Sequence, residues 1–166
     1  MNAGRAFLGT VVALMILTTA SLAGAATKTI WPTQFLPVLV RYNQFTQDSH
    51  YIQLESGAPQ MWFQAPIALP AGRQIVTFRF YCGTSYAGGG TLMATLLRTK
   101  LGDPVVNEVV AAVTCTNLYD GDPVLRPQED AIFAGSRVVA AGYLYWVQTT
   151  ASSTYNKIGA VQVVLK

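Results

Sequence analysis

Charged side chains are scarce in this sequence of 166 residues, where they make up 11% of the chain, against about a quarter in typical soluble proteins. The basic residues are scattered singly, so the formal net charge of +3 does not indicate nucleic-acid binding, which needs a clustered basic stripe. The surface must therefore be built largely from Thr, Ser, Gln, Asn, Tyr and exposed apolar groups. Such a surface is common in extracellular β-proteins and in subunits that bury surface against a partner.

Histidine is nearly absent as well, because His50 is the only one. A metal site would have to rely on carboxylates. In α/β-hydrolases the catalytic Ser, Asp and His follow one another in that order along the chain, and the position of His50 early in this chain does not allow that order around Ser85. Asp48 and Ser49 directly precede His50, but a triad needs geometry across the fold, so we expect a surface or turn histidine. The eight acidic residues offer no evident pair for a small secreted glycoside hydrolase. We expect no enzymatic activity and no cofactor.

The long apolar run of this chain lies at the N-terminus. One basic residue, Arg5, precedes the apolar residues 6–17, and small residues follow up to Ala23-Gly24-Ala25. This pattern predicts a signal peptide, residues 1–25, cleaved after Ala25. An uncleaved anchor is the alternative, but the run is short for the ~20 residues that span a bilayer. We therefore expect a secreted or periplasmic protein with one domain, residues 26–166, and no membrane span after cleavage.

Cysteine is limited to Cys82 and Cys115, and no CxxC motif or Cys/His cluster is present. A metal site is therefore disfavoured. Together with an export signal, an even number of cysteines predicts one disulfide, Cys82–Cys115, formed in an oxidising compartment. Two separate buried thiols are the alternative.

Short runs rich in Val, Ile, Thr, Tyr, Phe and Trp recur between frequent Gly and Pro residues, which is typical of many short strands. Residues 91–100 also fit a helix face, but their threonines and the lack of an acidic first turn favour a strand. An all-β fold is predicted, an antiparallel two-sheet β-sandwich of jelly-roll or Ig-like type. We expect strands at residues 38–42, 51–54, 60–65, 75–82, 92–98, 105–115, 137–140, 143–149 and 158–165.

Alternation within these segments predicts which side chains face the core. One face of the segment 75–82 carries Val76, Phe78, Phe80 and Cys82. In the last two segments, 143–149 and 158–165, both faces are apolar, so we expect that a partner or a second sheet covers one of them.

The glycine-rich stretch from Gly83 to Gly90 resembles two catalytic loops. Gly83 and Gly88 have the spacing of a P-loop, but Gly89 and Gly90 stand where Lys and Ser/Thr are needed to hold phosphate. The stretch is also close to the GxSxG elbow around Ser85, yet no histidine follows it. We therefore expect a hairpin or a loop at the sheet edge.

The most acidic region lies within residues 117–130. Asp120 and Asp122 are a weak candidate for Ca²⁺ ligands, since carboxylate oxygens suit that ion. The spacing of an EF-hand is absent, and Asp-Gly-Asp-Pro is an ordinary turn composition, so a turn is the favoured interpretation.

Four aromatic residues are candidates for ligand binding: Trp62, Tyr86, Tyr119 and Trp146. Adjacent strand residues point to opposite faces, so one member of a pair such as Tyr145 and Trp146 must leave the inner core. Exposed aromatic side chains can stack on sugar rings or anchor a protein partner. Alternatively, loops or another strand cover that second face.

Three stretches carry a resemblance to a known group: residues 69–81 (LPAGRQIVTFRFY), 89–98 (GGTLMATLLR) and 142–148 (GYLYWVQ). They resemble small exported bacterial β-sandwich proteins of unknown function, which have a Leu-Pro-x-Gly turn, a strand, a strand ending in Leu-x-Arg and a late Tyr-rich strand. The resemblance covers about half of the mature chain and implies a fold and export, but no activity. The two cysteines are not part of that pattern.

Taken together, these features predict an exported, non-catalytic β-sandwich protein with a binding or structural role. A homo-oligomer or an assembly with a cell-surface protein is consistent with the low content of charged residues. A carbohydrate-binding module that uses exposed aromatics is the alternative.

The signal-peptide interpretation predicts the N-terminus of the exported protein. When the full chain is expressed in a secreting bacterium, we expect N-terminal sequencing to begin at Ala26, because the preceding residues fit signal peptidase best there. Gly24 and Thr27 are the neighbouring starts that the same small residues allow. A protein that retains Met1 and stays in the membrane fraction would contradict this interpretation.

Overall fold

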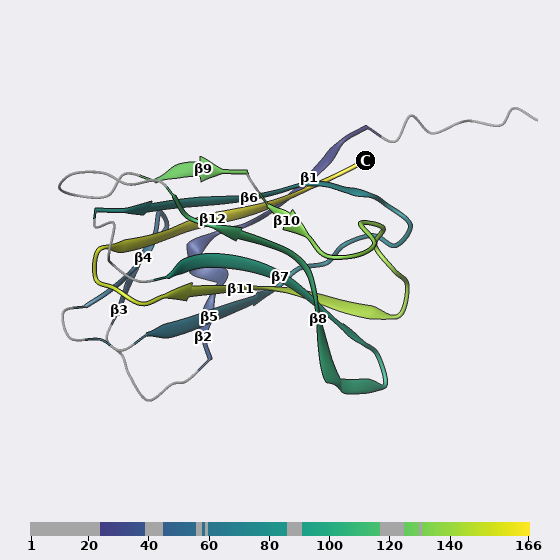
Figure 1. Cartoon of the computed structure of the whole chain (residues 1–166), viewed down its shortest axis with the longest axis horizontal. Helices are drawn as coiled ribbons and strands as arrows, with labels where there is room; N and C mark the ends of the chain where they lie inside the picture. The colour runs from purple at the N-terminus through teal and green to yellow at the C-terminus, as the bar shows by residue number, and fades with distance from the viewer. Residues whose placement is uncertain are drawn as a thin grey trace, which may run out of the picture.

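The computed structural model describes residues 24–38, 45–55, 58, 60–85, 91–116, 125–129 and 131–166. Two antiparallel sheets pack face to face in this part of the chain (Figure 1). The predicted all-β two-sheet sandwich is therefore confirmed. Its elements are β1 (Ala26–Ile30), the 3₁₀ helix η1 (Pro32–Gln34), β2 (Leu36–Pro37), β3 (Phe45–Gln47), β4 (Ile52–Leu54), β5 (Met61–Pro66), β6 (Ile75–Thr84), β7 (Leu92–Lys100), β8 (Asp103–Thr114), β9 (Arg126–Gln128), β10 (Ile132–Phe133), β11 (Tyr143–Ala151) and β12 (Asn156–Leu165).

Among the described residues, each of the two sheets has six strands, and the strand order differs between them. Sheet A has the order β3-β4-β12-β6-β9, and β1 also pairs with β12. Sheet B has the order β10-β8-β7-β11-β5-β2. All the pairs are antiparallel, and the longest ladders join β11 to β7, β12 to β6 and β7 to β8. No helix in the described part is long and apolar enough to cross a membrane.

The core fills the space between the sheets. Sheet A contributes Phe78 and Phe80, and sheet B contributes Phe63 and Val147; all four are completely buried. Phe45 of β3 meets Phe63 edge to face, with ring centroids 5.1 Å apart. Each such side chain stabilises the fold by about 1.5–3 kcal/mol through burial, so the alternating inward residues of the long strands account for the packing of one sheet on the other.

The long strands are the ones that their sequences predict. Residues 92–100 form a strand, β7, so the helix alternative for this stretch is wrong. The short strands β1, β3, β9 and β10 are not predicted, because two to five residues carry too little alternation to stand out. The expected strand at 137–140 is reduced to a single bridge between Gln74 and Val138. The expected strand at 38–42 lies largely outside the described residues, and β2 ends just before it.

Val76 is the one residue of the predicted inward set in β6 that does not face the core. The register shifts there, because Leu165 pairs with Ile75 whereas Val164 pairs with Thr77. Ile75 is buried in place of Val76, which is 37% exposed. A bulge of one residue moves every side chain beyond it to the other face, and nothing in the alternation itself reveals such a bulge.

The connection after β6 runs between the sheets. β6 pairs within sheet A and β7 within sheet B, so of the two expectations for the glycine-rich stretch, a hairpin or a loop at the sheet edge, the hairpin is wrong. Gly83 lies within β6, Ser85 donates its backbone N–H to the carbonyl of Tyr155, and residues 86–90 lie outside the described part.

A disulfide joins Cys82 to Cys115, as predicted, with the two Cα atoms 6.1 Å apart. Cys82 belongs to β6 of sheet A, and Cys115 directly follows β8 of sheet B. The bond therefore fastens one sheet to the other at the base of the connection after β6. It closes a loop with a sequence separation of 33 residues.

Removing this disulfide should lower the stability of the fold. For the double variant Cys82→Ala/Cys115→Ala we expect a loss of about 3–4 kcal/mol in the free energy of unfolding, because the unfolded chain regains the entropy of the open loop. Urea titration followed by tryptophan fluorescence measures the loss. As a control, thiol titration of the unreduced wild-type protein should find no free thiol, and two reactive thiols would contradict the pairing.

Candidate functional site

The outward-facing side of sheet B is the first candidate surface, and we call it the sheet B outer face. Cross-strand partners share a face, so the strand registers define its members. In β11 the inward Tyr145 and Val147 are buried, whereas Leu144, Trp146 and Gln148 point outward. Extending this set across the registers gives Leu36, Trp62, Gln64, Pro66, Met93, Thr95, Leu97, Thr99, Asn107, Val109, Ala112, Thr114, Ile132, Leu144, Trp146, Gln148 and Thr150.

This face carries no charged residue among its described members, although several of them are large and apolar. Ile132 is 79% exposed and Leu144 is 58% exposed. Leu36, Trp62 and Val109 are exposed as well. The outward side chains of the central strand β7 are mostly covered, so the exposed apolar groups lie on the strands to either side. The expectation that both faces are apolar in the last two strands is thus correct for β11, whereas the outer side of β12 carries Gln162 in a row of polar contacts.

The polar groups of the sheet B outer face bind one another. Gln64 donates from Nε2 to Oε1 of Gln148 at 2.9 Å, and Thr99 donates to Oδ1 of Asn107 at 2.7 Å. Both pairs join neighbouring strands of the sheet. These contacts satisfy part of the hydrogen-bonding capacity of the face from within, which lowers the cost of covering it with another surface.

Two of the four predicted ligand-binding aromatics lie on this face. Trp62 pairs in register with Thr150 and Trp146 with Pro66, so the two indoles are separated along the sheet. Trp62 is 38% exposed. Trp146 is half-buried, and its Nε1 is buried with no hydrogen-bond partner among the described residues. The other two predicted residues, Tyr86 and Tyr119, lie outside the described part.

An open hollow of about 440 Å³ lies at one edge of the same face, beside β2. Its lining comes from β2, β5 and β11 and includes Leu36, Pro66 and Trp146. Gln64 is the polar residue among the described side chains that line it.

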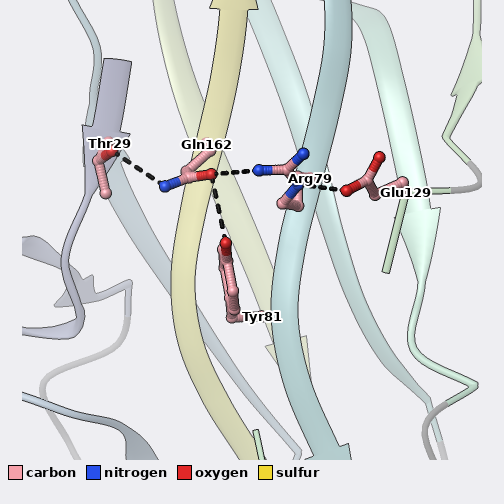
Figure 2. A network of polar contacts seen from close by, with 5 residues as sticks. All are labelled: Thr29, Arg79, Tyr81, Glu129 and Gln162. Atoms are coloured by element: carbon pink, nitrogen blue, oxygen red, sulfur yellow. Dashed lines mark hydrogen bonds and ion pairs between the residues drawn. The ribbon is translucent and has the colours of Figure 1, made fainter. Parts of the chain in front are cut away.

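The outward side of sheet A has a different character, because polar side chains form a row across it. Arg79 of β6 donates from Nη1 to Oε1 of Gln162 at 2.9 Å and from Nε to the carboxylate of Glu129. Gln162 in turn donates from Nε2 to the hydroxyl of Thr29 at 3.4 Å. Tyr81 points its hydroxyl at the same Gln162 oxygen (Figure 2). The ion pair with Glu129 raises the pKa of Arg79.

His50 lies in a surface turn, as expected. Asp48 accepts hydrogen bonds from the backbone N–H groups of Tyr51 and His50, which together hold the pKa of its carboxyl below the usual value. Ser49 and His50 contact each other through Oγ and Nδ1 at 3.1 Å. This is the geometry of an Asx turn, and the three residues form no catalytic triad.

The described carboxylates do not gather into a reactive site. Glu108 pairs with Arg98, and Glu129 pairs with Arg79. No carboxylate is among the described residues that line the hollow beside β2, and the described part of the chain contains no group of three His, Cys, Asp or Glu side chains that could hold a metal ion. The calcium candidates Asp120 and Asp122 lie outside the described part.

Sequence reasoning missed the polar row on sheet A. The outward positions of Arg79 and Tyr81 follow from alternation in β6, but the other members of the row come from elsewhere in the chain. Glu129 directly follows β9, and Thr29, which contacts Gln162, belongs to β1; the pattern does not reveal either of these short strands. Only the register of the sheet brings these residues together.

Among the comparisons with known proteins, the one with solved structures finds similar chains. No family model matches the chain, and no curated protein matches it. A solved structure of TmCBM61 in complex with beta-1,4-galactotriose aligns with this chain with a TM-score of 0.36 and 12% sequence identity, over 86% of this chain and 84% of the other.

Proposed function

We propose that this chain is an exported, non-catalytic binding module that assembles with a second copy of itself through the sheet B outer face. The observation that carries the proposal is the combination of large exposed apolar side chains with the absence of charged residues among the described members of that face. Exposed apolar patches of this extent favour association, because covering them releases ordered water. The disulfide supports export, since such bonds persist in oxidising compartments.

Face-to-face packing of two copies would repeat the geometry of the core. Within each copy, two sheets already stack through their inner faces, typically about 10 Å apart. A second contact through the sheet B outer faces would place four sheets in layers. Because the described members of the face carry no charge, a two-fold contact brings no like charges together among them.

The size of the face sets the expected strength of the contact. Six strands about 4.8 Å apart, crossed by about 20 Å of β11, give roughly 500 Å² in projection for each copy and about 1,000 Å² for the pair. Specific interfaces bury about 1,200–2,000 Å² in total. We therefore expect a dimer of modest affinity whose population depends on protein concentration.

A sugar-binding role for this face is less well supported. Stacking on a sugar ring needs a well-exposed aromatic face, whereas on this face Trp146 is half-buried and Trp62 is only partly exposed. Leu36, Leu144 and Ile132 supply most of the exposed apolar groups, and aliphatic side chains suit a protein surface better. A hydrolase would need two facing carboxylates, which the described part of the face does not offer.

Light scattering during size-exclusion chromatography tests the proposal. We expect the purified wild-type protein to shift from monomer towards dimer as its concentration rises. The variant Val109→Lys should remain monomeric, because it places one charge from each copy in an uncharged contact. Val76→Lys is the matched control, since Val76 lies in a strand of sheet A and is 37% exposed against 46% for Val109; it should dimerise like the wild type.

Two results would contradict the proposal. One is a wild-type protein that stays monomeric over the whole soluble concentration range. The other is equal loss of dimer in Val109→Lys and Val76→Lys, which would place the contact elsewhere or indicate a general loss of stability. Circular dichroism of both variants separates that last case, because a folded variant retains the spectrum of the wild type.

A further inference from the structure

Strand β12 has an irregularity at its middle, on the outer side of sheet A. Ile158 pairs with Cys82 and Val161 pairs with Phe80, so Gly159 and Ala160 together oppose Tyr81 alone. This two-against-one arrangement is a β-bulge, a feature that is frequent beside binding sites because it redirects side chains.

The bulge also marks a change of neighbour along the other edge of β12. Residues 157 and 158 pair with β4, whereas residues 161 to 165 pair with β1. Neither strand pairs with Gly159 or Ala160. The chain leaves β1 at Trp31 and enters β4 after Ser49 and His50, so these residues lie at the gap.

Gly159 has no room for a side chain. A Cβ atom placed there would lie 2.6 Å from the carbonyl oxygen of Tyr81 and 3.0 Å from Cδ1 of Leu125. Real Cβ atoms do not approach a backbone oxygen so closely, so glycine allows Tyr81 and Leu125 to close in on the bulge. The small side chain of Ala160 then leaves open space above the strand.

The result is a hollow of about 320 Å³ on the outer side of sheet A. Its size lies at the lower end of the range for small-molecule sites. Five separate segments line it, and the described side chains around it are Trp31, Ser49, His50, Tyr81, Leu125, Ala160 and Gln162.

Trp31 is the prominent aromatic wall of this hollow. Its backbone is held by η1, because its N–H donates to Oε1 of Gln34 at 2.8 Å and its carbonyl accepts from the Gln34 N–H. The residue nevertheless stays 56% exposed. A fixed backbone that presents a largely uncovered indole is preorganised for stacking, since little further ordering is needed when a ligand binds.

The polar edge of the hollow is provided by Tyr81, Gln162, Ser49 and His50. Gln162 is oriented by Arg79 and Thr29 in the row across the sheet (Figure 2). Charge is balanced beside the site, because Arg79 is paired with Glu129. The lining residues include no Asp, Glu, Lys or Arg.

From this geometry we propose that the hollow binds one unit of a neutral saccharide, with the ring stacked on Trp31 and its hydroxyl groups directed at Tyr81, Gln162 and the Ser49–His50 turn. A sugar ring has an apolar face of C–H groups and a polar rim, and the hollow offers an aromatic wall beside a set of neutral hydrogen-bonding groups. An anionic ligand would need an unpaired cation in the lining, and a cationic ligand would need a carboxylate; neither is among the lining residues. This site lies on sheet A and does not depend on the contact proposed for sheet B.

Isothermal titration calorimetry on the wild-type protein tests the site. The probes are neutral trisaccharides of glucose, galactose, mannose and N-acetylglucosamine, with trigalacturonate as the charged comparison. We expect at least one neutral trisaccharide to bind, and trigalacturonate to bind at least tenfold more weakly. Trp31→Ala should weaken the binding by about tenfold or more, because the stacking surface is lost.

Trp62→Ala is the matched control, since it removes a partly exposed tryptophan from the opposite sheet, and we expect affinity within twofold of the wild type. Tyr81→Phe removes only a hydroxyl and should weaken binding severalfold without a change in the urea midpoint. The proposal is overturned if no neutral trisaccharide binds at millimolar concentration, if trigalacturonate binds best, or if Trp31→Ala binds as tightly as the wild type. Equal loss in Trp31→Ala and Trp62→Ala would also overturn it.

Discussion

The pairing of β12 is the constraint on which sheet A depends. This strand bonds to β6 along one edge and to β4 and then β1 along the other, so it has a partner on both sides for most of its length. Its inward residues Val161, Val163 and Leu165 are completely buried, which anchors the sheet to the core. The bulge at Gly159 is the place where this pairing is interrupted, and the hollow on the outer side arises at the same place.

The two outer faces of the sandwich differ because the same alternation carries different residues in each sheet. In β11 the outward positions hold Leu144 and Trp146, whereas in β6 they hold Arg79 and Tyr81. An outward apolar residue gains nothing from the core and costs solubility, so a run of them on one face needs a reason outside the monomer. An outward row of linked polar residues needs no cover, and it remains open to water and to small polar ligands.

Sequence alone predicts the parts of this fold that repeat with a period of two over eight or more residues. The strands β6, β11 and β12 fall within that class, and so does the placement of Tyr145 and Trp146 on opposite faces, whereas β7 and β8 are predicted from their β-forming residues between Gly and Pro. The cysteine count predicts the bond between Cys82 and Cys115, since only one pairing is possible. The bulges at Val76 and Gly159 break the period without changing the residue types. The role of Trp31 at the hollow depends on the end of β1, a strand of five residues whose Thr-Lys-Thr centre carries no apolar alternation to detect. Contacts between distant segments, such as Arg79 with Glu129, follow from register rather than from local pattern.

The placement of the two surfaces has a consequence for how they would work together. The two sheets pack face to face (Figure 1), so the sheet B outer face and the hollow on the outer side of sheet A point in opposite directions. A dimer that covers the sheet B faces would therefore leave both hollows free, one on each outer side of the four-layer stack. Two such sites cannot close on a single short ligand, but they can hold two chains or two stretches of one long chain. Binding to a repetitive polymer would then gain from effective concentration, so that a weak single site becomes a strong attachment. Modest affinity at each surface is consistent with such an arrangement, since neither contact has to be strong alone.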